Sequence, residues 1–260
     1  LISKWLEPNK YEIETFYIHN FKGSFLKTFQ NNNIFLIGDA AYQIPPYASQ
    51  GLNSGIRDIL NLIWKINLVV NFKCNENLLL TYSLERVKQI KETIKSSIAL
   101  GQLIDSLSFA FQKNIPFEEA IAPEARDQAF GRRNSFYEEN TNKGIFSNLQ
   151  KEKFFNRRLA NREITDQSDS PFLDKMIGNY FAIFSRTDIK NKLDMHTYEK
   201  LKNLKFKFIF DFTNLTIGSD LAEYLENGEL ILRPDKKIFG ISTKKFDINQ
   251  LALELLEQIE

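Results

Sequence analysis

The most informative part of the sequence is residues 34–68, which read IFLIGDAAYQIPPYASQGLNSGIRDILNLIWKINL. The apolar run at residues 34–37, ended by Gly38-Asp39, predicts a buried strand of a layered α/β sheet. Apolar residues then recur at intervals of three and four, which predicts a helix over residues 52–70 with one buried stripe: Leu52, Ile56, Ile59, Ile63, Ile66 and Val70. The same spacing predicts a second helix over residues 76–100, with Leu80, Leu84, Val87, Ile90, Ile94 and Ile98 on one face.

The polar residues of this stretch suit a ligand with hydroxyl groups and an electron-rich ring. A carboxylate at Asp39 lies where a strand ends, which is the edge of the sheet at which α/β folds bind ligands. Gly51 opens the helix, so a flat ligand can approach the free amides and the partial positive charge of the helix start. Pro45-Pro46 stiffens the loop between them and presents carbonyl groups.

This pattern resembles the second flavin-binding motif of the para-hydroxybenzoate-hydroxylase-like, or class A, FAD-dependent aromatic monooxygenases. The matching groups are GDAA at residues 38–41, the proline pair, QGLN at residues 50–53, GIRD at residues 55–58 and NLIWK at residues 61–65. Tyr82 with Glu85-Arg86 matches the later Y-x-x-E-R of the same family. Residues 11–19 resemble the strand that precedes the motif. Further matches, at Phe172-Leu173-Asp174 and Leu232-Arg233-Pro234-Asp235, point to the branch that hydroxylates phenols and hydroxyphenylpropionates.

The resemblance implies a cofactor site and a reaction. The cofactor would be FAD, held by Gly38, Asp39, Pro46, Gly51, Leu52 and Asn53. Asp39 would hold the ribityl chain, the helix-start amides would face the pyrimidine edge, and the Pro46 carbonyl would border a small phenolic substrate. NAD(P)H would be the co-substrate and dioxygen the oxidant. No side chain of this chain is assigned a catalytic role, and no metal site is expected. Arg57 and Asp58 are expected to form a structural pair on the helix, and Arg86 is likewise expected to be structural.

Three departures from the family pattern matter. Tyr42 replaces the family's histidine, and Ser49 replaces a glycine, where a Cβ would be strained if that position needs a positive φ. The family's GxGxxG turn, which holds the pyrophosphate of FAD, is not found in the printed sequence. We therefore expect a carboxyl-terminal portion of the enzyme, inactive alone, which pairs with an amino-terminal half carrying GxGxxG. An uncovered apolar face would also favour homo-oligomers.

The expected fold class is α/β, with three regions. Residues 1–104 would be the carboxyl half of an FAD-binding, glutathione-reductase-like domain, and residues 105–169 a helical or irregular connection. Residues 170–260 would be a degenerate thioredoxin-like domain, because strands at 180–184 and 206–212, a hairpin at 229–233 and 237–242, and a final helix at 248–259 follow in that order. Its CxxC motif is absent. In the connection, the pairs Arg132-Arg133 and Arg157-Arg158 are expected on the solvated surface.

The composition narrows the classes of protein. The 260 residues carry 34 Lys plus Arg against 33 Asp plus Glu, a balance that argues against a nucleic-acid binder. Charged and amide residues interrupt every long apolar stretch, so no membrane span is predicted. The single cysteine, Cys74, fits a cytoplasmic setting. The alternatives are a non-catalytic fragment or interaction module from a split or decayed flavoprotein gene, and a halogenase or isoprenoid reductase with a related GD motif.

Overall fold

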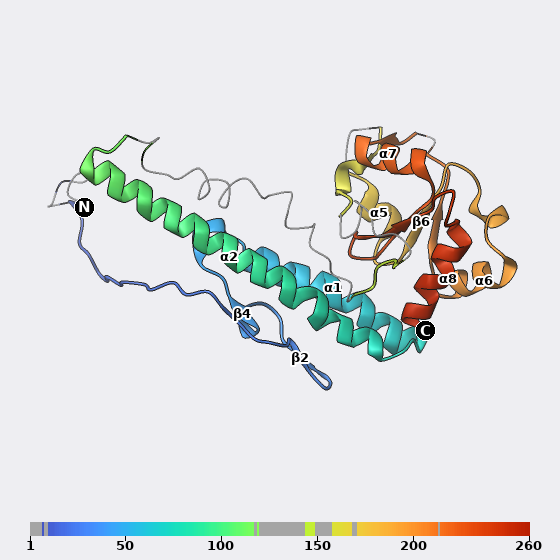
Figure 1. The fold of residues 1–260 in the computed structure, drawn as a ribbon, viewed down its shortest axis with the longest axis horizontal. Helices are drawn as coiled ribbons and strands as arrows, with labels where there is room; N and C mark the ends of the chain where they lie inside the picture. The colour runs from blue at the N-terminus through green and yellow to red at the C-terminus, as the bar shows by residue number, and fades with distance from the viewer. Residues whose placement is uncertain are drawn as a thin grey trace.

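The computed structural model describes residues 7, 10–116, 119, 144–148, 158–167, 171–212 and 214–260. Two long antiparallel helices, α1 (Gly51–Phe72) and α2 (Asn77–Lys113), form the axis of the molecule, and a mixed lobe of helices and strands packs at one end of them (Figure 1). The segment that precedes α1 runs below the two helices in this view, and it contains the strands β2 (Gln30–Asn31) and β4 (Tyr42–Gln43) (Figure 1).

The segment before α1 contains short hairpins in place of a layered sheet. Strand β1 (Ser24–Phe25) pairs with β4 (Tyr42–Gln43), and β2 (Gln30–Asn31) pairs with β3 (Ile34–Phe35), both antiparallel. The prediction of a buried strand at residues 34–37 is wrong, because β3 has only a two-residue hairpin partner among the described strands and Ile34 is 65% exposed. Residues 11–23 form no strand either.

Both long helices form where the apolar spacing predicts them, and α2 continues past the expected boundary at residue 104 to Lys113. The predicted buried stripe on α1 is wrong, since Leu52 is 80% exposed and Ile59 and Ile63 are about half exposed. The face of α1 that is buried against α2 and the lobe carries polar groups as well as Leu62, Trp64 and Leu68. On α2, Ile90 and Ile94 are buried but Leu80 and Leu84 are exposed.

The lobe is built on a four-stranded sheet of order β10-β9-β6-β7. Strand β6 (Ala182–Phe184) is parallel to β7 (Lys207–Ile209) and antiparallel to β9 (Leu230–Leu232), which forms a hairpin with β10 (Ile238–Ile241). The lobe's helices are α5 (Leu173–Ile177), α6 (Met195–Asn203), α7 (Ser219–Asn227) and α8 (Ile248–Ile259). A small sheet of β5 (Ile164–Thr165) and β8 (Thr216–Ile217) and the short 3₁₀ turns at Asn161–Glu163 and Ile189–Asn191 complete it.

Two predicted elements of the lobe are confirmed. The hairpin over residues 229–242 forms around Arg233–Lys236, with Lys236 at a φ of 65° and its amide bonded to the Arg233 carbonyl at 2.9 Å. Helix α8 has its predicted bounds because Asp247 and Gln250 form a capping box at its start and Leu251, Leu255 and Ile259 face the core.

The core of the lobe is continuous with the long helices. Trp64 and Leu68 of α1 and Leu78 of α2 belong to the same buried cluster as residues of the sheet and of α8. The Trp64 ring packs edge-on against Phe181, with 5.2 Å between ring centroids. A second cluster fills the opposite side of the sheet under α5 and α7, and a third holds the hairpins of the first segment against α2.

Candidate functional site

The six residues that the sequence singles out lie around the start of α1. Gly38 and Asp39 belong to a 3₁₀ turn (Gly38–Ala40), Pro46 begins a second one (Pro46–Ala48), and the remaining three form the first turn of α1: Gly51, Leu52 and Asn53. Asp39, Leu52 and Asn53 are exposed. The Ser97 hydroxyl of α2 donates to the Pro45 carbonyl at 2.6 Å and so fixes the loop that joins the two turns.

Gly38 is favoured at its position by its backbone conformation. Its φ is +55°, a region that side chains with a Cβ occupy at a cost. A Cβ built on Gly55 would lie 3.6 Å from the Gly38 Cα, so the 3₁₀ turn rests on the backbone of α1. The positive φ of Gly38 therefore lets the turn form, and the turn lies in van der Waals contact with α1 at Gly55.

Asp58 holds this turn in place. Its fully buried carboxylate accepts hydrogen bonds from the Gly38 amide at 3.0 Å, the Tyr42 hydroxyl at 2.6 Å and the Arg86 Nε at 2.6 Å. Burial, together with the bond to Asp58, raises the pKa of Tyr42 well above its ordinary value. Tyr42 thus acts as a hydrogen-bond donor beneath the turn, at the position where the family pattern has histidine.

The expected pairing of Arg57 with Asp58 is wrong. The Arg57 side chain is exposed and donates to Gln50 Oε1 at 3.2 Å, because successive residues of a helix point in different directions. Arg86 is the partner of Asp58, and its Nη2 also donates to the Ser54 carbonyl at 3.2 Å. The structural role expected for Arg86 agrees with these buried contacts.

The loop before α1 has the strained residue that the sequence suggested. Ser49 has a φ of 50°, in the left-handed region, so a Cβ does occupy a position that favours glycine. Its amide donates to the Pro46 carbonyl at 3.0 Å. The Pro46 carbonyl is therefore partly engaged inside the turn.

The start of α1 and Asp39 fit the parts of FAD that the resemblance assigns to them. The first amide of α1 that bonds within the helix region is that of Ser54, to the Gln50 carbonyl at 2.9 Å, so the three preceding amides have no intrahelical acceptor. A Cβ added to Gly51 would meet no atom within 4 Å, which leaves open space for a flat ring. The exposed Asp39 carboxylate can accept hydrogen bonds from ligand hydroxyls.

A second group of charges is buried where the lobe meets the long helices. The Glu85 carboxylate of α2 accepts from Arg233 Nη2 at 2.8 Å, Asn61 Nδ2 at 2.8 Å and Lys65 Nζ at 3.2 Å. Arg233 also donates to Asp235 Oδ2 at 2.7 Å and to the Ile145 carbonyl at 2.8 Å. We call this group the junction cluster; its charged members are Lys65, Glu85, Arg233, Asp235 and Lys237.

The junction cluster holds three cations and two carboxylates away from water, and burial together with these charges shifts their pKa values. Desolvation lowers the pKa of Lys65 to about 7 and that of Lys237 to about 8, although Glu85 opposes both shifts. For Glu85 the surrounding cations outweigh desolvation and lower the pKa well below its ordinary value. Glu85 and Arg233 therefore stay charged, whereas the ammonium groups of the two lysines can lose their protons near neutral or slightly alkaline pH.

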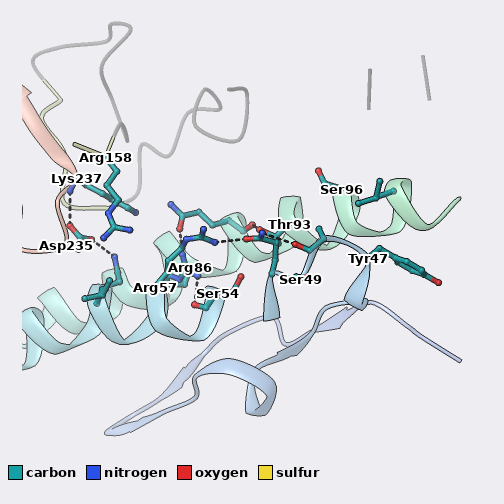
Figure 2. A pocket seen from close by; sticks show the side chains of 16 residues that line it. Tyr47, Ser49, Ser54, Arg57, Arg86, Thr93, Ser96, Arg158, Asp235 and Lys237 are labelled. Atoms are coloured by element: carbon teal, nitrogen blue, oxygen red, sulfur yellow. Dashed lines mark hydrogen bonds between the residues drawn. The ribbon is translucent and has the colours of Figure 1, made fainter. Parts of the chain in front are cut away.

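A pocket of about 470 Å³ lies between the loop before α1, the two long helices and the turn of the β9–β10 hairpin (Figure 2). Tyr47 and Ser96 lie at one end, and Arg158, Asp235 and Lys237 lie at the other (Figure 2). None of the six predicted flavin residues lines this pocket, but their neighbours Tyr47, Ser49, Gln50 and Ser54 do. The pocket and the predicted flavin site therefore share one loop.

The pocket's charged floor was not predicted. The sequence motifs include four members of this floor but indicate no role for them: Lys65, Glu85, Arg233 and Asp235. A charged pair at the turn directly after an apolar strand, as in Leu232-Arg233-Pro234-Asp235, is the signal that could have identified it. Arg158 lines the pocket, whereas Arg132, Arg133 and Arg157 lie outside the described residues. Within the described part of the chain, no helix combines the length and apolar character needed to cross a membrane.

Comparison with known proteins places the sequence match on the first part of the chain. Residues 6–97 match the FAD binding domain family. A 3-(3-hydroxy-phenyl)propionate/3-hydroxycinnamic acid hydroxylase of Klebsiella pneumoniae subsp. pneumoniae is 40% identical over 107 residues, which is 40% of this chain and 19% of that protein. A probable NADH-specific resorcinol 4-hydroxylase of Rhodococcus jostii is 33% identical over 102 residues, covering 39% and 19%.

Solved structures extend the likeness in fold to most of the chain. Aklavinone-11 hydroxylase, solved with FAD and aklavinone, superposes with a TM-score of 0.62 at 16% identity, over 91% of this chain and 46% of that one. The flavin-dependent monooxygenase PieE, solved with FAD and substrate, gives 0.60 at 17% identity, over 89% and 48%. The chain thus spans about half the length of these structures. Residues 6–97 carry an FAD binding domain sequence, and the chain shares the fold of FAD-dependent hydroxylases over about nine-tenths of its length.

Proposed function

We propose that this chain is the flavin-ring-binding part of an FAD-dependent enzyme that hydroxylates a phenolic substrate with NAD(P)H and dioxygen. The match of residues 6–97 to the FAD binding domain carries this proposal. The named curated relatives act on hydroxylated aromatic compounds, and one is named as NADH-specific, which supports the substrate class and the co-substrate. The single cysteine of the sequence, Cys74, supports a cytoplasmic setting.

The residues that would hold FAD surround the start of α1. Asp39 would accept hydrogen bonds from the ribityl hydroxyls, and Gly38 would bring that turn close to the cofactor. The amides of Gly51, Leu52 and Asn53 would donate to the pyrimidine edge of the ring, where the helix start stabilises negative charge. Bound FAD would supply the oxygen-transfer chemistry, and these residues would bind and orient it. The free amides, the open space at Gly51 and the exposed Asp39 support this assignment.

A further segment carrying a GxGxxG turn would complete the flavin site. The apolar stripe on α1 supports this, because Leu52, Ile56, Ile59, Ile63 and Val70 are 46–80% exposed. A contiguous apolar face of this kind marks a surface that another polypeptide segment covers. Ile34 and Ile37 add to the same set of exposed apolar side chains. We expect the segment that binds the pyrophosphate and adenosine of FAD to pack there.

The lobe at residues 170–260 is proposed to be thioredoxin-like. Its sheet order β10-β9-β6-β7, with β6 parallel to β7 and antiparallel to β9, supports this assignment. The sequence has no CxxC pair, so the proposed role is to support the long helices through the junction cluster and not to carry out thiol chemistry.

Fluorescence titration with FAD tests the flavin assignment. We expect the purified 260-residue chain to bind FAD only in the millimolar range, because several charge-assisted bonds to the pyrophosphate are missing. The genomic sequence upstream is then read for a frame encoding GxGxxG, and that segment is co-expressed. We expect a yellow complex in which Asp39→Ala raises the Kd for FAD by about ten- to hundredfold. The exposed Asp105 of α2 supplies the matched control, Asp105→Ala.

The outcomes separate the proposed functions. Flavin affinity that is unchanged in Asp39→Ala would show that Asp39 only braces its turn. Stop codons upstream and a colourless complex would favour the alternative, a non-catalytic interaction module.

A further inference from the structure

We propose that the pocket between the loop before α1 and the β9–β10 hairpin binds a small organic oxyanion, a carboxylate or a phosphate attached to a flat apolar body. This goes beyond the proposed flavin chemistry, because it assigns a ligand to a cavity that none of the predicted flavin residues lines. Its volume of about 470 Å³ lies in the range of small-molecule sites.

The charge of the pocket wall favours an anion. Of the sixteen described residues that line it, four are cationic, namely Arg57, Arg86, Arg158 and Lys237, and one, Asp235, is acidic. Arg86 is paired with the buried Asp58 at 2.6 Å, so Arg57, Arg158 and Lys237 are the cations available to a ligand. Asp235 is already engaged, since its Oδ2 accepts from Arg233 at 2.7 Å. Below the wall, the junction cluster adds two further cations, Lys65 and Arg233, against one further carboxylate, that of Glu85. An anion in the pocket would offset this excess.

Two buried polar groups in the pocket wall lack hydrogen-bond partners. Lys237 is 9% exposed, and its Nζ makes no hydrogen bond, although it lies 3.6 Å from Glu85 Oε2. Ser54 is 1% exposed, and its Oγ also makes none. A buried donor without a partner has lost its hydrogen bonds to water, so a ligand that accepts from it gains more than it would at an exposed surface. An ammonium and a hydroxyl are both donors that an oxyanion accepts from.

Arg57 supplies a cation that can move to the ligand. Its side chain lies between the two ends of the pocket and is exposed, and its bond at 3.2 Å is to the neutral Gln50 amide oxygen (Figure 2). A guanidinium binds a carboxylate or phosphate with two parallel hydrogen bonds, which is stronger than a bond to a neutral acceptor. It is therefore favourable for the Arg57 guanidinium to release the Gln50 amide oxygen and to bind an oxyanion in its place.

The opposite end of the pocket suits a flat apolar body. The Tyr47 ring lies there and packs over Gly101 of α2, where an added Cβ would come within 2.4 Å of the ring. Leu100 lines the same region. The Tyr47 ring packs at Gly101 and Lys237 lies beside Glu85, which places these two residues about 24 Å apart along α2. A small ligand whose charged group lies near Arg57 and Lys237 therefore directs its flat body along the pocket toward the Tyr47 end without spanning it.

Calorimetric titration of the 260-residue chain without flavin tests this inference. The probes are benzoate, phenyl phosphate and inorganic phosphate, with benzylamine and phenol as matched cationic and neutral compounds. We expect saturable binding of benzoate or phenyl phosphate, and at least tenfold weaker binding of benzylamine and phenol. Preference for benzoate identifies a carboxylate ligand. Preference for phenyl phosphate together with binding of inorganic phosphate identifies a phosphate ligand.

Variants connect the binding to the pocket. Arg57→Gln should raise the Kd of the preferred probe by about tenfold, the effect of losing one hydrogen bond to a charged group. Arg57 is exposed, so this variant should keep the fold. Lys91→Gln, an exposed lysine of α2 that does not line the pocket, removes the same charge and should leave the Kd unchanged. Lys237→Gln should also raise the Kd of the preferred probe relative to the parent chain.

Two results would overturn the inference. One is binding of benzylamine as tight as that of benzoate. The other is an equal Kd in Arg57→Gln, in Lys91→Gln and in the parent chain. Because no flavin is present in these titrations, either result leaves the proposed hydroxylase function untouched, and a failed flavin titration leaves this inference untouched.

Discussion

The Tyr42 hydroxyl donates a 2.6 Å hydrogen bond to the buried carboxylate of Asp58, which also accepts the Gly38 amide. A residue that departs from the family pattern therefore braces the turn that carries Asp39. Tyr42 is buried, so this bond holds the turn from its buried side and helps to position the proposed flavin-binding carboxylate of Asp39.

Tyr42→Phe should destabilise the chain. The substitution removes one of the donors to a fully buried carboxylate, which costs about 1–3 kcal/mol in the free energy of unfolding. Tyr82→Phe is the matched control, since the Tyr82 hydroxyl donates to a neutral acceptor, the Leu36 carbonyl, at 2.8 Å. Urea unfolding should show the smaller loss for Tyr82→Phe. Equal losses would contradict a special role for the Tyr42–Asp58 bond.

Gly38→Ala should also destabilise the chain, by about 1–2 kcal/mol, because Gly38 has a φ of +55°. Gly51→Ala offers the contrast, since Gly51 opens α1, has no positive φ and has no atom within 4 Å of an added Cβ. Urea unfolding should give an unchanged or slightly higher stability for Gly51→Ala. A neutral Gly38→Ala would show that the turn can relax.

Glu85→Gln should be among the most damaging single substitutions. It leaves Lys65, Arg233 and Lys237 buried with Asp235 as the remaining carboxylate of the junction cluster. Breaking a buried ion pair by removing one partner costs about 3–5 kcal/mol. Glu92→Gln breaks the surface pair with Lys95 and should cost less than about 1 kcal/mol. Chemical unfolding of both variants measures the difference, and similar values would mean that water reaches the cluster.

Stability should rise with pH just above neutrality. Folded Lys65 has a pKa lowered to about 7, whereas an unfolded lysine keeps its proton up to about 10.5. Between these values the unfolded chain binds more protons, so the free energy of unfolding increases with pH. Lys237, with a pKa lowered to about 8, adds to the same trend.

Urea unfolding between pH 7 and 8.5 measures this slope, below the ordinary pKa of 9.0 for Cys74. Lys65→Met leaves two cations facing the two carboxylates of the junction cluster and should flatten the slope. A slope that is the same in Lys65→Met would place the titration elsewhere.

Ile59→Gln with Ile63→Gln should reduce self-association of the chain. Both side chains are about half exposed on the apolar stripe of α1, and contiguous apolar surface drives association. Sedimentation velocity over a range of concentrations measures the oligomeric state. Leu253→Gln changes an exposed apolar residue of α8 and should leave it unchanged. Equal association of all variants would show that another surface is responsible.

Local sequence patterns predicted where the helices lie but not which of their faces are buried. The bounds of α8 follow from Asp247, Gln250 and three leucine or isoleucine residues, all within one helix. The spacing from Leu52 to Val70 likewise predicted α1, but periodicity shows only that one face is apolar. It does not show that a neighbouring segment covers that face, and here the opposite, more polar face is buried.

The two charged groups of the site depend on contacts that local patterns do not contain. Asp58 and Arg86 are 28 residues apart and meet because α1 and α2 are antiparallel. Glu85 and Arg233 are 148 residues apart and meet only when the lobe packs on the helices. The motifs contain these residues, but only the folded chain shows which charges neutralise one another and that the Lys237 Nζ remains without a hydrogen bond.

The burial of Arg233 has a consequence for how the chain unfolds. The Arg233 side chain belongs to the lobe, but its guanidinium donates hydrogen bonds to Glu85 of α2 and to the Ile145 carbonyl. Separating the lobe from the long helices would leave Arg233 unpaired on the lobe and Glu85 unpaired on α2. Unfolding of either part alone therefore has a large free-energy cost. The long helices and the lobe should therefore melt together in one cooperative transition, and heat would destroy the proposed flavin-binding turn and the distant sheet at the same temperature.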